Sequence, residues 1–119
     1  VYKRQCDTGP APFYKELGKK FGPIDLGFGN LGAYNFYPII PVKDKSTAHA
    51  NPEELLSLMK DLKVKKVIGM HWGTAILSLE PIWEPPVRFK ENAEMFGYKK
   101  EEAIIFRIGE IKKLNDLIN

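Results

Sequence analysis

Cysteine and histidine are scarce in this 119-residue sequence, which contains one cysteine, Cys6, and two histidines, His49 and His71. A single cysteine excludes an internal disulfide and any zinc site built from cysteines. No apolar run approaches the roughly 20 residues that a membrane-spanning helix needs, and no signal-peptide pattern opens the chain. Any catalytic chemistry must therefore come from a small number of side chains.

An excess of charge of one sign is also lacking. The sequence has 18 basic and 15 acidic residues, a net charge of +3, and no long run of either sign. This small net charge gives no electrostatic field strong enough to indicate binding of nucleic acid, and we expect no nucleic-acid partner. With 44% hydrophobic and 28% charged residues the composition is typical of a globular domain. We expect a cytoplasmic protein, with peripheral membrane contact as a further possibility.

The beginning of the chain lacks an initiator methionine and most of the strand expected to lead into Asp7. We therefore expect the chain to be part of a longer protein. Residues 1–5 (Val-Tyr-Lys-Arg-Gln) resemble the translation of a transposase-adapter sequence from sequencing libraries. We interpret these residues as non-native and assign residues 6–119 to the domain.

Helical patterns alternate with short apolar strands, which indicates an α/β layered architecture. The expected elements are a helix over 13–21, a strand over 24–28, a long loop over 29–50, a helix over 51–62, a strand over 67–70, a helix over 86–96 and a terminal hairpin over 103–114. The clearest boundary is at Asn51, which can cap a helix with Glu54 three residues later and Pro52 at the first helical position. Four apolar residues at helical spacing are expected in the core: Phe13, Phe21, Leu58 and Met59.

Two candidate functional residues follow the predicted strands directly. Asp7 precedes Thr8-Gly9, and His71 begins the segment His71-Trp72-Gly73-Thr74. Ligands collect at the carboxyl ends of strands in open α/β sheets, and a carboxylate with an imidazole suits a cation such as zinc. A capped turn at Asp7 and a hydrogen-bonded core histidine at His71 explain the same residues equally well.

The triplet Asp7-Thr8-Gly9 is also the active-site triplet of aspartic proteases, in which two such aspartates share a proton. Those enzymes consist almost entirely of β-strands, whereas helical patterns dominate this sequence. In aspartic proteases the triplet usually follows apolar residues and precedes Ala or Ser. In this sequence Gln5-Cys6 precede the triplet and Pro10 follows it. We therefore disfavour a protease.

Several motifs occur in order between Asp7 and about Gly109. They are Cys6-Asp7-Thr8-Gly9, Phe13-Tyr14-Lys15-Glu16-Leu17-Gly18, Phe21-Gly22-Pro23-Ile24-Asp25-Leu26, Gly32-Ala33-Tyr34, His49-Ala50-Asn51-Pro52-Glu53-Glu54 and His71-Trp72-Gly73-Thr74. Together they resemble the carboxy-terminal half of the N-acylphosphatidylethanolamine-hydrolysing phospholipases D and their bacterial relatives, in the metallo-β-lactamase superfamily. The resemblance implies half of an αββα sandwich, with a mixed sheet and flanking helices.

The resemblance also implies roles for individual residues. Asp7 would bridge two zinc ions and His71 would bind one of them, while a metal-bound hydroxide attacks the phosphodiester. His49 would be catalytic and substrate-binding, either holding a phosphate oxygen or moving a proton, although it could simply cap a helix beside Asn51. Tyr34 would line the substrate site or pack beneath its loop.

The implied function is hydrolysis of N-acylphosphatidylethanolamine to N-acylethanolamine and phosphatidic acid. The expected partners are a phospholipid or another phosphodiester substrate, and a second copy of the chain in a homodimer. The loop that contains Tyr34, Phe36 and Tyr37, followed by Pro38-Ile39-Ile40, could face a lipid or its acyl chain. Two alternatives stay open: a hydrolase of the same superfamily that acts on a sugar-phosphate lactone, and a non-catalytic α/β binding domain in which Asp7 and His71 are structural.

The sequence departs from the family pattern because it has no His-x-His-x-Asp-His motif, which supplies most ligands for both metals. A catalytic zinc ion ordinarily needs about three protein ligands, and Asp7 and His71 are two. We therefore predict that the 119-residue chain alone binds zinc weakly and does not hydrolyse phosphodiesters. Zinc titration by calorimetry and a turnover assay check this, and tight stoichiometric zinc with turnover would contradict it.

Overall fold

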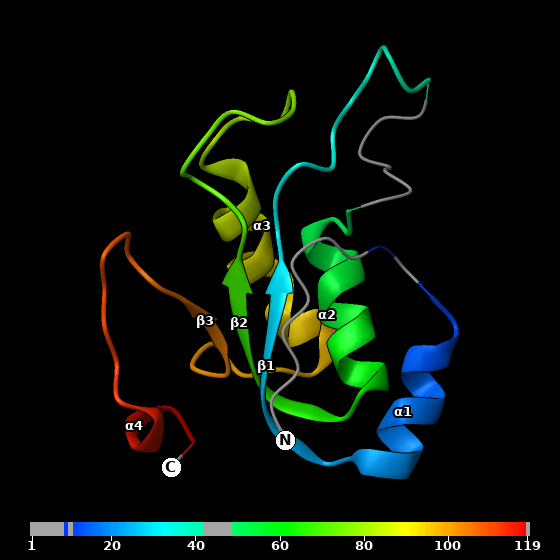
Figure 1. Cartoon of the computed structure of the whole chain (residues 1–119), viewed down its shortest axis with the longest axis vertical. Helices are drawn as coiled ribbons and strands as arrows, with labels where there is room; N and C mark the ends of the chain where they lie inside the picture. Colours follow the sequence, from blue (N-terminus) through cyan, green and yellow to red (C-terminus); the bar gives the residue numbers. More distant parts are fainter. Residues whose placement is uncertain (1–8, 10, 42–48, 119) are drawn as a thin grey trace.

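A computed structural model describes residue 9 and residues 11–41 and 49–118. The predicted metal ligand Asp7 therefore lies outside the described residues, as do residues 1–5 and Cys6. The described elements follow one another as helices and strands in alternation (Figure 1). No helix among them is long and apolar enough to cross a membrane.

The centre of the structure is a three-stranded sheet in the order β1 (Ile24–Asn30), β2 (Val64–Met70) and β3 (Ala103–Ile105). The two pairings between these strands are both parallel, with Gly29 opposite Gly69 and Gly69 opposite Ile105. Most residues of β1 and β2 are buried beneath the helices, as in other parallel sheets, whereas Asp25 and Lys65 near the starts of the strands are exposed and form an ion pair at 2.7 Å. The expected α/β class, with a sheet and flanking helices, is confirmed.

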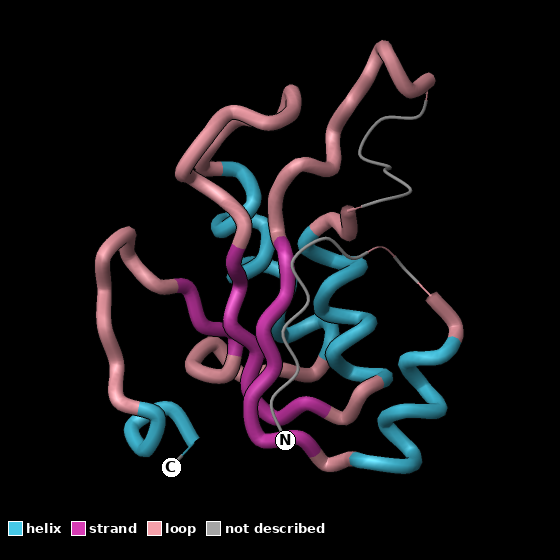
Figure 2. The backbone as a smooth tube through the Cα atoms, viewed as in Figure 1, coloured by secondary structure: helices cyan, strands magenta, loops and turns pink. Residues whose placement is uncertain are grey.

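The helices between the strands provide the crossovers that parallel pairing needs. Helix α2 (Pro52–Asp61) joins β1 to β2, and α3 (Glu84–Asn92) with the short helix η1 (Ala93–Phe96) joins β2 to β3. Figure 2 shows α2 beside the sheet and α1 (Phe13–Phe21) on the far side of α2 from the sheet. The larger core cluster lies on this face and includes Leu55, Val67 and Phe89.

Helix α2 begins where the sequence predicts. The side chain of Asn51 accepts a hydrogen bond from the Glu54 backbone at 2.8 Å, and the Glu54 carboxylate accepts one from the Asn51 backbone at 3.0 Å. This reciprocal capping satisfies two amide groups that have no partner within the helix. Leu58 and Met59 of the same helix are buried, as expected.

Helix α1 has the predicted bounds but a different buried face. Phe13 is 45% exposed and Phe21 is 53% exposed, whereas Tyr14 and Gly18 are buried. A Cβ atom at Gly18 would collide with the backbone of Asp61 and Leu62. Because Gly18 packs directly against the end of α2, the face of α1 that carries Tyr14 and Gly18 is the buried one. The expectation that Phe13 and Phe21 lie in the core is therefore wrong.

The predicted terminal hairpin is also wrong. The segment from residue 103 forms β3, which pairs with β2, and the chain ends in the short helix α4 (Leu114–Ile118). Gly109 has φ 82° and forms a turn. The backbone N–H of Arg107 donates a hydrogen bond to the Glu110 carboxylate across this turn at 2.8 Å. Leu117 then packs on the second face of the sheet against Leu26 and Ile68.

Candidate active site

The carboxyl ends of β1 and β2 lie at the same edge of the sheet, where Asn30 pairs with Met70. Figure 1 shows the loops after the two strands leaving the sheet side by side. The backbone of Leu31 donates a hydrogen bond to the Met70 carbonyl at 2.8 Å. At Gly32 a Cβ atom would lie 2.6 Å from the His71 carbonyl oxygen, so glycine permits this close approach of the loops.

The structure brings the two histidines together at this edge. The centroids of the His49 and His71 rings are 5.3 Å apart, with an angle of 35° between the planes. His71 follows β2 directly and has φ 63°, an uncommon conformation for a residue with a side chain, which begins the turn after the strand. His49 lies two residues before the Asn51 cap of α2. Residues 22 positions apart thus meet because β1 and β2 are parallel neighbours.

His49 is held by the loop after β1. Its Nδ1 atom lies 2.8 Å from the carbonyl oxygen of Ala33. Because a carbonyl oxygen only accepts hydrogen bonds, Nδ1 must carry the proton in this contact. The neutral ring then has its lone pair on Nε2.

Glu80, from the loop after β2, holds the same segment from its other side. Its carboxylate accepts hydrogen bonds from the backbone of Ala33 at 2.6 Å and of Asn35 at 3.0 Å. Burial acts to raise the pKa of Glu80, but hydrogen bonds from the Ser78 hydroxyl and from the backbone amides of Glu80, Asn35 and Ala33 outweigh it and lower the pKa below its ordinary value. Glu80 is therefore a carboxylate at neutral pH.

Tyr34 lies beneath the loop and is fully buried. Its hydroxyl donates a hydrogen bond to Glu84 at 2.7 Å and accepts one from Arg88 at 3.3 Å, while the Arg88 guanidinium lies 5.1 Å from the ring centroid. Burial, followed by the hydrogen bond to Glu84, raises the pKa of Tyr34 above its ordinary value. The role of Tyr34 in substrate binding stays a prediction, and in this structure its side chain supports the loop.

Arg88 links Tyr34 to the start of α2. Its Nε and Nη2 atoms donate to the two carboxylate oxygens of Glu53 at 3.1 and 2.7 Å, and Nη1 donates to Glu84 at 3.1 Å. Burial acts to lower the pKa of Arg88, but the hydrogen bonds with Glu53 and Glu84 raise it above its ordinary value. A planar guanidinium suits this two-pronged contact, and an ammonium group does not.

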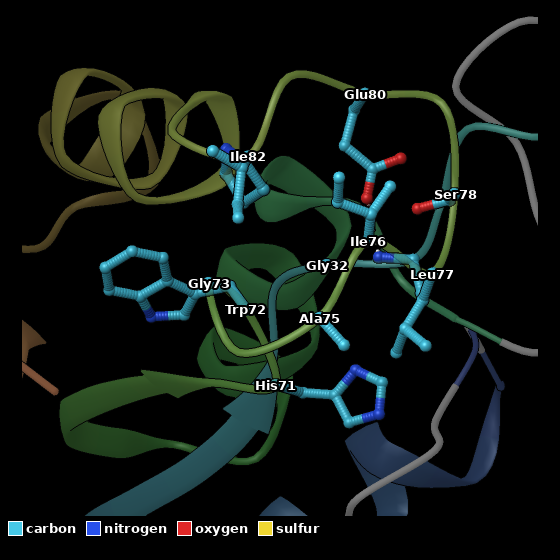
Figure 3. A pocket seen from close by; sticks show the side chains of 12 residues that line it. Gly32, His71, Trp72, Gly73, Ala75, Ile76, Leu77, Ser78, Glu80 and Ile82 are labelled. Atoms are coloured by element: carbon cyan, nitrogen blue, oxygen red, sulfur yellow. Dashed lines mark hydrogen bonds between the residues drawn. The ribbon is translucent and has the colours of Figure 1, made fainter.

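A small pocket opens between the two loops, beside His71 (Figure 3). Its wall includes Ala33, Trp72, Leu77 and Glu80. Figure 3 shows the His71 ring below the loop that carries Ala75 to Glu80. The pocket thus places an imidazole and a carboxylate among apolar side chains.

The donor atoms at this edge fit part of a zinc site. The imidazole of His71 offers a nitrogen ligand of the type that zinc prefers, and the ring of His49 lies beside it. The buried amide of Asn30 has no hydrogen-bond partner among the described residues, so the edge retains polar groups that these residues do not satisfy. Within residues 9, 11–41 and 49–118, however, no group of three histidine, cysteine or acidic side chains could hold a metal.

Glu80, Glu84 and Arg88 are the supporting residues that sequence reasoning missed. Glu84 and Arg88 are spaced four residues apart, which is readable as an ion pair on a helix. Nothing in the sequence indicates their contact with Tyr34, because Arg88 and Tyr34 are separated by 54 positions. Glu80 is separated from Ala33 by 47 positions, and no local pattern marks it.

Comparison with known proteins gives both structural and sequence relatives, although no family model matches the chain. A solved metallo hydrolase from the archaeon Ignicoccus hospitalis superposes on 84% of this chain and 34% of its own, with a TM-score of 0.54 and 22% identity. This likeness shows that the chain shares the fold of part of that protein.

In sequence the chain is similar to N-acyl-phosphatidylethanolamine-hydrolyzing phospholipase D 1 of Caenorhabditis elegans, with 30% identity over 87% of this chain. It is 47% identical to the mitochondrial protein of that name from Saccharomyces cerevisiae over 43% of this chain. The chain covers 28% and 11% of the lengths of these relatives. It is thus similar to N-acylphosphatidylethanolamine-hydrolysing phospholipases D, and the resemblance inferred from its motifs is confirmed.

The contacts of Arg88 predict a stability cost for Arg88→Lys. Lysine keeps the charge but loses the paired contact with Glu53 and the contact with the Tyr34 hydroxyl, so we expect a loss of about 1–3 kcal/mol in the free energy of unfolding. Chemical denaturation measures it. Arg107→Lys, on an exposed turn, is the matched control and should change little. An equal loss of unfolding free energy in the two variants would contradict a stabilising role for the contacts of Arg88.

Proposed function

We propose that this chain is part of a zinc-dependent phosphodiesterase that hydrolyses N-acylphosphatidylethanolamine to N-acylethanolamine and phosphatidic acid. The observation that carries the proposal is the pair of imidazole rings, 5.3 Å apart, at the carboxyl edge of a parallel sheet. The similarity to proteins named for this reaction supports the choice of substrate. A cytoplasmic location with peripheral membrane contact belongs to the same proposal, as does a homodimer.

In this proposal His71 and Asp7 would be two of the residues that hold zinc. Zinc supplies Lewis-acid stabilisation of the charge that develops on the phosphate. His71 suits a ligand because it stands at the end of β2, where Gly32 allows the neighbouring loop to approach. The further ligands that a catalytic zinc site needs must come from outside the described residues.

His49 has a different role from His71. Its Nδ1 atom is engaged with the Ala33 carbonyl, so Nε2 is the atom that can exchange a proton with the reacting phosphodiester or hold a phosphate oxygen. The same contact fixes the ring's orientation next to His71. His49 therefore serves as a proton-transfer or substrate-holding group, and not as a principal metal ligand.

Substitution of the two histidines separates these roles. In the complete protein encoded by the gene that contains this sequence, His71→Ala should lower both the zinc content and the hydrolysis of N-acylphosphatidylethanolamine. His49→Ala should lower hydrolysis by about 100-fold or more, the typical contribution of a positioned acid or base, and leave zinc content unchanged. Elemental analysis and product release from vesicles measure the two effects.

Each histidine variant is the control for the other, because they lie side by side. Loss of zinc from both variants, or from neither, would contradict the assignment. A His-x-His-x-Asp-His motif upstream of Asp7 would support the enzyme over a non-catalytic binding domain. Assay against a panel of sugar-phosphate lactones distinguishes the proposed substrate from the alternative within the superfamily.

The membrane contact is proposed from exposed apolar side chains on the two loops around the site. Ile39 is 82% exposed and Tyr37 is 52% exposed in the loop after β1, while Ile76 is 84% exposed in the loop after β2. The backbone of Leu79 donates a hydrogen bond to the Asn35 carbonyl at 2.9 Å, so the two loops are joined. Apolar residues gathered at the mouth of a site suit the entry of a lipid substrate.

The test of this contact is Ile39→Ser in the complete protein. Because a polar residue cannot enter the acyl region, we expect weaker binding to phosphatidylcholine vesicles and slower lipid hydrolysis with zinc content unchanged. Vesicle flotation measures the binding. Ile111→Ser is the matched control, since Ile111 is 93% exposed in the segment between β3 and α4. Unchanged activity of Ile39→Ser on vesicles would exclude the contact.

A further inference from the structure

Three segments that are distant in sequence meet at the residue Ala33. Its backbone N–H donates to Glu80 at 2.6 Å, and its carbonyl oxygen accepts from His49 at 2.8 Å. Ala33 thus stands between the loop after β2 and the residues that lead into α2. Any movement of its backbone changes both contacts, because the amide and the carbonyl belong to the same residue.

The conformation of Ala33 needs support. Its φ is 64°, in the left-handed region that residues with a Cβ atom rarely adopt. Glu80 places one carboxylate oxygen on the amide of Ala33 and the other on that of Asn35, at 2.6 and 3.0 Å. The carboxylate therefore bridges the two amides on either side of Tyr34 and stabilises the turn that Ala33 makes.

We propose that Glu80 is a positioning residue that sets the tautomer of His49 through the backbone of Ala33. With Ala33 held in place, its carbonyl faces Nδ1 of His49 and requires the proton to be on that atom. Nε2 is then the unprotonated atom of the neutral ring. The catalytic value of this arrangement rests on the proposed role of His49, whereas the control of the tautomer does not.

A support from Arg88 acts on the same loop in a different way. Arg88 contacts the side chain of Tyr34, with the guanidinium 5.1 Å from the ring centroid, and holds the loop from the helix layer. Glu80 contacts the backbone, at the residue whose carbonyl binds His49. Glu80 therefore contacts the residue that binds the imidazole of His49, whereas Arg88 does not. We expect the tautomer of His49 to depend on Glu80 more than on Arg88.

The test measures the tautomer of His49 in the metal-free form of the complete encoded protein, labelled with 15N-histidine, at alkaline pH where imidazole is neutral. Long-range 1H–15N spectra distinguish the two ring nitrogens. We expect His49 of the unmodified chain to be the Nδ1–H tautomer. Glu80→Gln keeps the size of the side chain but offers one acceptor oxygen in place of two, so we expect a mixture of both tautomers.

Glu94→Gln is the matched control, because Glu94 is an exposed residue of η1, away from the loops, and it should leave the tautomer unchanged. The backbone resonances of β2 report whether each variant is folded. If Glu80→Gln does not fold, Glu80→Asp, which keeps the charge but shortens the reach, replaces it with the same expected mixture. A single Nδ1–H tautomer in the folded Glu80 variant, or an Nε2–H tautomer in the unmodified chain, would overturn the proposal.

These outcomes are independent of catalysis. No zinc and no substrate enter the measurement, so an inactive protein does not alter the result. Conversely, full activity of a His49→Ala variant would contradict the proposed role of His49 in the reaction, and absence of hydrolysis by the complete unmodified protein would contradict the proposed function, while the dependence of the tautomer on Glu80 could still be observed. The two proposals therefore fail separately.

Discussion

Parallel pairing of β1 with β2 is the constraint on which the candidate site depends, because it brings the carboxyl ends of both strands to one edge of the sheet. The pairing places His71 beside the loop that contains Ala33, and the crossover through α2 returns His49 to the same edge. Ring centroids 5.3 Å apart are the result. A shift in register would separate the histidines without changing either residue.

The loops at this edge are held by charged groups in addition to the core contacts of Leu31 and Trp72. Glu80 binds the backbone on one side of the loop after β1, and Arg88 binds the Tyr34 side chain on the other. Partly buried hydrogen bonds to charged groups are directional, and they fix an orientation more closely than apolar contact does. This explains how an exposed rim of apolar residues such as Ile39 can surround a site whose histidines keep defined positions.

Local signals account for what the sequence predicts correctly. Helix α2 was readable from Asn51 because its cap is formed within four residues, and β2 was readable from its apolar run. The terminal hairpin was wrong because the turn at Gly109 is local, whereas the pairing of β3 with β2 depends on distant residues. His49 and His71 were found through motifs, while Glu80 was missed because its contact spans 47 positions. The exposure of Phe13 follows from close packing at Gly18, which periodicity does not reveal.

The most direct test of a zinc site at this edge is anomalous scattering at the zinc absorption edge from crystals of the complete encoded protein. The account predicts a zinc peak about 2.0–2.1 Å from an imidazole nitrogen of His71, the usual distance for this ligand, and none at that distance from His49. A carboxylate oxygen of Asp7 should lie within ligand distance of the same peak. A zinc peak remote from His71, or a fully zinc-loaded protein in which His71 makes no metal contact, would contradict it.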